Sequence, residues 1–155
     1  MERGRSQEVQ EAVGGDQAKL GNRLIVIDTD AIIDFFGNIS PGAEVVSELI
    51  SNGEAVLTSI TVFELYAGVE GKRRLSQIET LVRDLMVLPL DAIEAATAGK
   101  IYTQLKMKGQ LIGTNDILIA AVCLANGLPL YTKNVTHFLK IKDIQILTRE
   151  EILRY

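Results

Sequence analysis

Three acidic residues stand in apolar surroundings, where a carboxylate suggests chemistry: Asp28, Glu64 and Asp116. Asp28 ends the apolar run LIVID, Glu64 lies within SITVFELYAG, and Asp116 is near the start of TNDILIAAVCLANG. Carboxylate oxygens are hard ligands that suit Mg²⁺ or Mn²⁺. No two of these acids are close in sequence, so only the fold can bring them together. Taken jointly, they predict a divalent-metal site.

Each of the three acids also has a structural interpretation. Asp28 could cap a short helix that begins near Asp30, since Asp is favoured at that position. Asp116 could serve only to stabilise the first turn of its helix through the helix dipole. Glu64 could face water at the rim of the fold. Its mostly small or apolar helical neighbours argue against this, because a carboxylate in a packed face is costly unless it is paired or bound to a cation.

Other catalytic chemistries fit the sequence less well. His137 is the single histidine, which excludes a His-rich zinc site, and an isolated histidine is more often a surface or packing residue than a catalyst. Cys123 is the single cysteine and lies in an apolar run, so we expect a small core residue in a reducing, cytoplasmic setting. The string GVEGKR lacks the spacing and the Ser or Thr of a phosphate-binding loop.

Length and charge limit the classes of protein. A chain of 155 residues with 47% hydrophobic residues suits one globular domain, which we assign to residues 23–155 after a disordered lead-in at 1–22. The net charge of -4 argues against broad, purely electrostatic binding of nucleic acid. No apolar stretch is long and uncharged enough to span a bilayer, and the N-terminus lacks a secretory signal, so we expect no membrane association.

From Arg23 onward, short apolar runs alternate with helical patterns. Strands are predicted at 24–28, 55–58, 86–89, 129–131 and 145–147. Helices are predicted at 31–36, 42–51, from 59 onward, and at 72–85, 91–108 and 114–126. This alternation indicates a parallel sheet flanked by helices. In such sheets, binding sites form beyond the carboxyl ends of the strands, which is where Asp28 is expected.

The chain from about Leu24 to the C-terminus resembles a PIN domain. The segments that carry the resemblance are IDTDAIIDFF, SITVFELYAG, PLD with the following AGKIYTQLKMKG, GTNDILIAA and GLPLYTKNVTHF. In combination and order they are similar to the VapC-like toxins, small endoribonucleases that a cognate antitoxin inhibits. The resemblance implies an α/β fold of three layers, α/β/α, with a central, mainly parallel sheet of four to five strands.

The resemblance also implies roles for individual residues. Asp28, Glu64 and Asp116 would be the catalytic acids that hold Mg²⁺ or Mn²⁺. The family often has an aspartate where this chain has Asn134, which can offer a carbonyl oxygen but no charge. Thr29 and Thr132 are expected to orient the acids, with ordinary strand-end hydrogen bonding as the alternative. Contacts to RNA phosphates, or merely a solvated surface, are expected for Lys72, Arg73, Arg74, Lys106, Lys108 and Lys133.

The implied activity is metal-dependent hydrolysis of RNA phosphodiester bonds in the cytoplasm. The implied partners are the RNA substrate, a VapB-like antitoxin and a second copy of the chain in a homodimer or larger assembly. One alternative is a non-catalytic PIN-fold module that binds RNA or protein, which Asn134 would favour. Another is a phosphoacceptor signalling domain that uses Asp28, Asp30 and Lys133, but it gives no reason for the position of Glu64.

Overall fold

The predicted apolar runs form a parallel sheet covered by helices on both faces. The computed structural model describes residues 23–153, so the predicted lead-in at 1–22 lies outside the described residues. The strands are β1 (Ile25–Ile27), β2 (Ala55–Thr58), β3 (Met86–Leu88) and β4 (Leu130–Tyr131). They pair in the order β3-β2-β1-β4, and every pairing is parallel.

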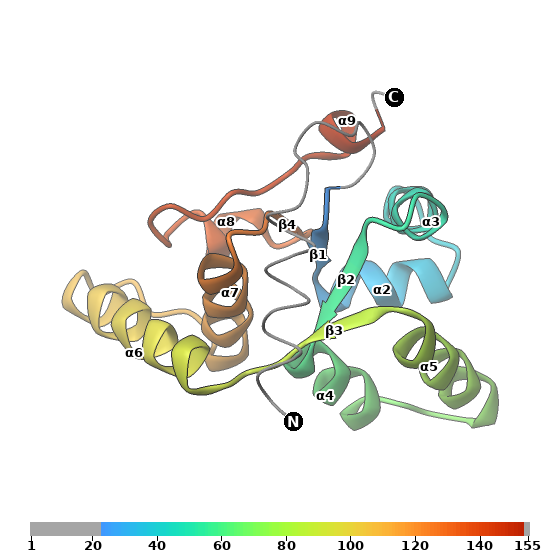
Figure 1. Ribbon diagram of the computed structural model, residues 1–155, viewed down its shortest axis with the longest axis horizontal. Helices are drawn as coiled ribbons and strands as arrows, with labels where there is room; N and C mark the ends of the chain where they lie inside the picture. The colour runs from blue at the N-terminus through green and yellow to red at the C-terminus, as the bar shows by residue number, and fades with distance from the viewer. Residues whose placement is uncertain (1–22, 154–155) are drawn as a thin grey trace.

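Helices form the two outer layers (Figure 1). Their bounds are α2 (Thr29–Phe36), α3 (Gly42–Ser51), α4 (Ser59–Ala67), α5 (Lys72–Asp84), α6 (Ala92–Met107), α7 (Thr114–Asn126), α8 (Val135–Phe138) and α9 (Arg149–Ile152). Alternate residues of β1 point to opposite layers: Val26 packs in a core with α6 and α7, whereas Ile25 and Ile27 pack with α2 and α3. The three-layer fold expected from the sequence is therefore confirmed.

The predicted strand at 145–147 was wrong. That segment meets β4 only in one isolated parallel bridge, between Leu130 and Ile146, where Leu130 exchanges backbone hydrogen bonds with Gln145 and Leu147. Sequence analysis also missed α8 and α9, which are four residues each and too short to show a helical period. In addition, α2 begins at Thr29, earlier than expected, because Asp28 caps it.

Because the strands are parallel, β1, β2 and β4 all end at the same edge of the sheet. Asp28 follows β1, Thr58 ends β2 and Thr132 follows β4, so their side chains emerge at the carboxyl ends of neighbouring strands. Next to this edge, α7 crosses the core as a buried helix. Its Cys123 is fully buried, and burial raises the pKa of the thiol well above its usual value, which confirms a core residue.

No helix within residues 23–153 is both long and apolar enough to cross a membrane.

Candidate active site

Asp28 both caps α2 and faces the sheet edge. Its Oδ1 accepts the backbone N–H of Thr29 at 2.8 Å, and its Oδ2 accepts the hydroxyl of Thr132 at 2.7 Å. The side chain is almost completely buried, with 4% of the residue exposed. The capping interpretation is thus correct, and it does not exclude a second role, because the same carboxylate also binds a residue beyond β4.

Burial makes the ionised form of Asp28 unfavourable. Desolvation raises the pKa of this carboxyl group to about 6, and the negative charges of Asp116 and Asp30 add to the rise. The hydrogen bonds from Thr132 and Thr29 act in the opposite direction. A carboxylate held in this way near neutral pH is typical of a functional site, and a nearby cation would relieve its cost.

Glu64 reaches the same edge from α4. It is partly buried, and its Oε1 accepts the hydroxyl of Thr29 at 2.7 Å, so it does not simply face water. Thr29 therefore binds two acids at once, Asp28 through its backbone N–H and Glu64 through its side chain. The prediction that Thr29 orients acidic side chains is consistent with these contacts.

Asp116 approaches from the first turn of α7 and meets residues that follow β4. Nδ2 of Asn134 donates to its Oδ2 over a long 3.5 Å, and the backbone N–H of Asn134 donates to the hydroxyl of Thr132 at 2.9 Å. His137 also lies here, with Nδ1 3.4 Å from the same Asp116 oxygen and 2.7 Å from Nδ2 of Asn134. Sequence analysis missed His137; its spacing of three residues from Asn134, one helical turn, was the available signal.

These contacts form a continuous path, here called the acid network, whose members in order are Glu64, Thr29, Asp28, Thr132, Asn134 and Asp116. The three acids are joined through hydroxyl and amide groups, not through direct contacts. Among residues 23–153, no three His, Cys, Asp or Glu side chains lie close enough together to hold one metal ion by themselves.

Lys133 forms an ion pair beside the acid network. Its Nζ lies 2.8 Å from Oδ2 of the buried Asp34, and this partner raises the pKa of Lys133. Gly42 packs against Asp34 so closely that a Cβ on the glycine would lie 2.7 Å from Cβ of Asp34. The pair fixes Lys133 to α2 and so anchors the turn between Thr132 and Asn134. A phosphoacceptor site would require Lys133 to pair with Asp28. Lys133 pairs with Asp34 instead.

The other basic candidates lie on two helices away from the acid network. Nζ of Lys106 is 6.0 Å from the ring centroid of Tyr102, and Lys108 follows the last turn of α6. Lys72, Arg73 and Arg74 form the first turn of α5. The structure therefore does not gather the six predicted cations into one surface.

A family model described as PIN domain matches residues 25–143, which include all four strands and α2 to α8. The chain belongs to the PIN-domain family. This PIN domain is 37% identical over 103 residues to Ribonuclease VapC2 of Haemophilus influenzae, a match that covers 63% of this chain and 78% of the relative. It is 32% identical over 120 residues to Ribonuclease VapC1 of Methanocaldococcus jannaschii, covering 77% of this chain and 82% of the relative.

Solved structures with the same PIN fold come from toxin–antitoxin complexes. A DNA-bound VapBC structure from Salmonella typhimurium matches with a TM-score of 0.71 and 27% identity, over 81% of this chain and 97% of that one. VapBC-1 from nontypeable Haemophilus influenzae matches with a TM-score of 0.67 and 29% identity, over 80% and 96%. The fold of this PIN domain therefore extends over nearly the whole of those chains.

Proposed function

We propose that this PIN domain is a metal-dependent endoribonuclease and the toxin of a VapBC-type toxin–antitoxin pair. The observation that carries the proposal is the acid network, which links Asp28, Glu64 and Asp116 at the carboxyl edge of the sheet. Relatives at 32–37% identity are named Ribonuclease VapC, which supports the same activity.

The donor set suits a hard divalent cation that keeps part of its own water. Mg²⁺ commonly binds through one or two carboxylates and completes its shell with water and substrate phosphate. Asp116 is close enough for its negative charge to raise the pKa of Asp28, so a cation near both acids would offset their repulsion. Glu64 would then influence the metal site through its hydrogen bond with Thr29, and the side-chain carbonyl of Asn134 could hold a water bound to the metal. A divalent ion therefore does not need three direct protein ligands here.

The proposed reaction is hydrolysis of an RNA phosphodiester, in which water attacks phosphorus in line and the 3′-oxygen departs. A divalent ion bound at this edge would supply Lewis acidity for attack and for the charge that develops on the phosphate. Thr29 and Thr132 hold the oxygens of Asp28 in fixed directions before substrate arrives. Asp116 is more open than Asp28, with 22% of its side chain exposed, so substrate would reach this pair of acids from the side of α7 and α8.

Removal of metal tests the activity directly. Protein treated with EDTA is expected to leave a 5′-labelled single-stranded RNA intact, and Mg²⁺ or Mn²⁺ is expected to restore cleavage, because repulsion between Asp28 and Asp116 opposes function without a cation. Gel analysis of the labelled RNA is the measurement. Equal cleavage in EDTA would contradict metal dependence. If the protein neither cleaves RNA nor binds Mg²⁺ in a calorimetric titration, the result would favour the alternative of a non-catalytic module, which is suggested by Asn134 in place of an aspartate.

Thr132 offers a finer test of the acid network. Thr132→Val keeps the shape of the side chain but removes the donor to Asp28 and the acceptor for the backbone of Asn134. We expect cleavage to fall roughly 10–100-fold, the usual effect of losing a residue that orients a metal ligand. Thr132→Ser retains the hydroxyl and should stay near the wild-type rate. Equal rates for the valine and serine variants would show that the hydroxyl plays no part.

The proposed partner is a VapB-like antitoxin, as in the VapBC complexes with similar folds. A segment of it would lie across the acid network and present Arg or Lys to the carboxylates, since Asp28 and Asp116 attract a cation of any kind. We also propose that the toxin acts in the cytoplasm and self-associates as a homodimer or larger assembly.

A further inference from the structure

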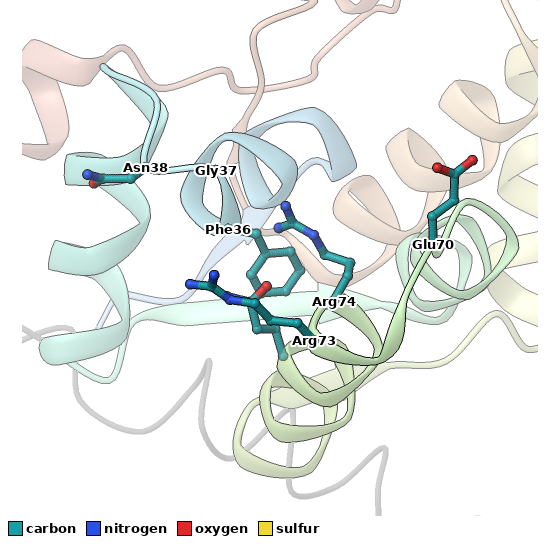
Figure 2. Close-up of a pocket in the computed structure, with 7 residues that line it drawn as sticks. Phe36, Gly37, Asn38, Glu70, Arg73 and Arg74 are labelled. Atoms are coloured by element: carbon teal, nitrogen blue, oxygen red, sulfur yellow. The ribbon is translucent and has the colours of Figure 1, made fainter.

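A polar cavity, separate from the acid network, lies where the end of α2 meets the start of α5. It encloses about 460 Å³, and its walls include Phe36, Glu70, Arg73 and Arg74. Figure 2 shows the two arginine side chains beside the Phe36 ring, while the carboxylate of Glu70 points away from both guanidinium groups. The cavity is therefore basic on the side that Phe36 lines.

Arg74 is held in place and still lacks an acceptor. Its guanidinium carbon lies 5.1 Å from the centroid of the Phe36 ring, a cation–π contact that fixes the plane of the group. Its Nη1 is buried and has no hydrogen-bond partner in the part of the chain that the structure describes. A buried donor without an acceptor is unfavourable, so a small rotation toward an acceptor in the cavity would be favourable.

The start of α5 gathers positive charge against the usual preference of a helix. Its first turn contains Lys72, Arg73 and Arg74 and no acid, although the positive end of the helix dipole disfavours cations there. Gly71 precedes the helix and supplies no side-chain cap. Within residues 23–153, neither Arg73 nor Arg74 forms an ion pair with an acid. Local sequence choices that oppose helix stability in this way often mark a functional position.

We infer that this cavity binds a phosphate group of the RNA strand, outside the bond that is cleaved. A guanidinium fixed on an aromatic ring presents its remaining donors in a plane that suits a phosphate. The chain carries a net charge of -4, so a polyanion must be held at a few local cations. Lys133 is already paired with Asp34, whereas Arg73 and Arg74 have no acidic partner among the described residues 23–153. This inference rests on the proposed ribonuclease function.

The cavity and the acid network lie at opposite ends of one helix. Thr29 begins α2 and Phe36 ends it, so the two sites are about 10 Å apart along an axis that rises about 1.5 Å per residue. Figure 1 shows α2 leaving the end of β1 on the side of the sheet that α5 also covers. An RNA strand of a few nucleotides can therefore span both, with its scissile phosphate at the acid network.

The test measures RNA binding separately from cleavage. Fluorescence anisotropy of a labelled single-stranded RNA in EDTA, at several salt concentrations, gives both the affinity and its salt dependence. Loss of one phosphate contact should reduce the slope of log affinity against log salt by about 0.7 for a single strand, so Arg73→Ala combined with Arg74→Ala, which removes both arginines from the same phosphate, should reduce it by about 0.7. Arg83→Ala, at the far end of α5 with a side chain 73% exposed, is the charge-matched control for the single variant Arg73→Ala and should leave the slope near wild type.

Two further variants separate binding from folding. Arg74→Lys keeps the charge but loses the planar fork, and it should weaken RNA binding while thermal unfolding stays near wild type. Arg73→Ala alters an exposed side chain, so it reports on binding even if Arg74→Ala unfolds. Unchanged affinity and slope in Arg73→Ala and Arg74→Lys would overturn the inference. Weaker antitoxin binding by these variants, with RNA binding unchanged, would overturn it in favour of an acidic protein segment.

Failure of this inference can be told apart from failure of the proposed function. If wild-type protein cleaves RNA with Mg²⁺ while the arginine variants bind RNA as wild type does, only the cavity assignment fails. If wild-type protein cleaves no RNA under any metal, the ribonuclease proposal fails. A supporting result in the cleavage assay is a raised KM with nearly unchanged kcat in the arginine variants, since a contact outside the cleaved bond affects binding of substrate and transition state alike.

Discussion

Asp116→Asn is expected to reduce metal-dependent RNA cleavage at least about 100-fold, because losing a proposed metal ligand should cost no less than losing a residue that merely orients one. Asp116 is more exposed than Asp28 and receives a hydrogen bond from Asn134. Asparagine keeps its size and can still accept that hydrogen bond, but it removes the charge that attracts a cation. Asp28→Asn should have the same effect on cleavage. It also removes one of the two neighbouring negative charges that would attract the cation.

The measurement is the single-turnover cleavage rate of a labelled RNA with saturating Mg²⁺, alongside thermal unfolding of each variant. Asp84→Asn is the matched control, because Asp84 is an exposed acid whose partner is the neighbouring Arg83. Loss of an acid from the first turn of α7 should change stability by only about 0.3–1 kcal/mol, so the fold should persist. Full cleavage by Asp116→Asn would refute the assignment of this acid.

Asp28→Asn is expected to stabilise the metal-free protein at neutral pH while it abolishes activity. Asp28 is 4% exposed, and burial raises its pKa from an ordinary 3.8 to about 6. Holding this carboxylate ionised therefore costs on the order of 3 kcal/mol at neutral pH, because one pKa unit corresponds to about 1.4 kcal/mol. Asparagine removes this cost and retains an acceptor for Thr29, but the hydroxyl of Thr132 must find a new arrangement. We expect a net gain of about 1–2 kcal/mol.

The sign of the pH dependence follows from proton binding. Between the unfolded and folded pKa values of Asp28, the folded protein binds more protons than the unfolded one, so the free energy of unfolding falls as pH rises from about 4 to about 6. The wild-type protein therefore carries a cost at high pH that the variant lacks. At the acid end of this window, the free energy of unfolding of the variant should be equal to that of the wild-type protein or lower.

Urea unfolding in EDTA at about pH 4 and about pH 8 measures this difference. Asp84→Asn again serves as control, because removal of an exposed acid should produce no comparable change between the two pH values. A variant Asp28→Asn that is less stable than wild type at both pH values would show that the hydrogen bonds of Asp28 outweigh its desolvation. The stabilisation and the loss of activity, taken together, would identify Asp28 as an acid kept for function at the expense of stability.

Several parts of the site were accessible from the sequence because they depend on local pattern. LIVID reads as a buried strand from its apolar run, and Asp28 stands at its end. Asp116 is recognisable as the acid that opens an otherwise apolar helix. The family resemblance, which rests on short motifs along the chain, implies that Thr29 and Thr132 orient the acids, and both hydrogen-bond to acids of the network. Such signals need only the neighbours of a residue along the chain.

Other parts depended on contacts between distant segments. His137 gave no sign of a role until Asp116, 21 residues earlier, was placed beside it. Lys133 looked like a candidate for RNA binding, and only the packing of α2 revealed its pair with Asp34. The segment at 145–147 had the composition of a strand, yet only the fold shows that it meets β4 in one isolated bridge.

By itself, the sequence determined the parallel α/β class, the buried strands, the family and the three acids, because periodicity, burial and motif order are properties of neighbouring residues. The tertiary structure alone decided which hydroxyls and amides connect those acids, and which arginines lack acidic partners within the described part of the chain. The physical reason is the strand order β3-β2-β1-β4, which places β1 between β2 and β4. That arrangement brings Asp28 within 2.7 Å of a hydroxyl 104 residues away, a contact that no local pattern records.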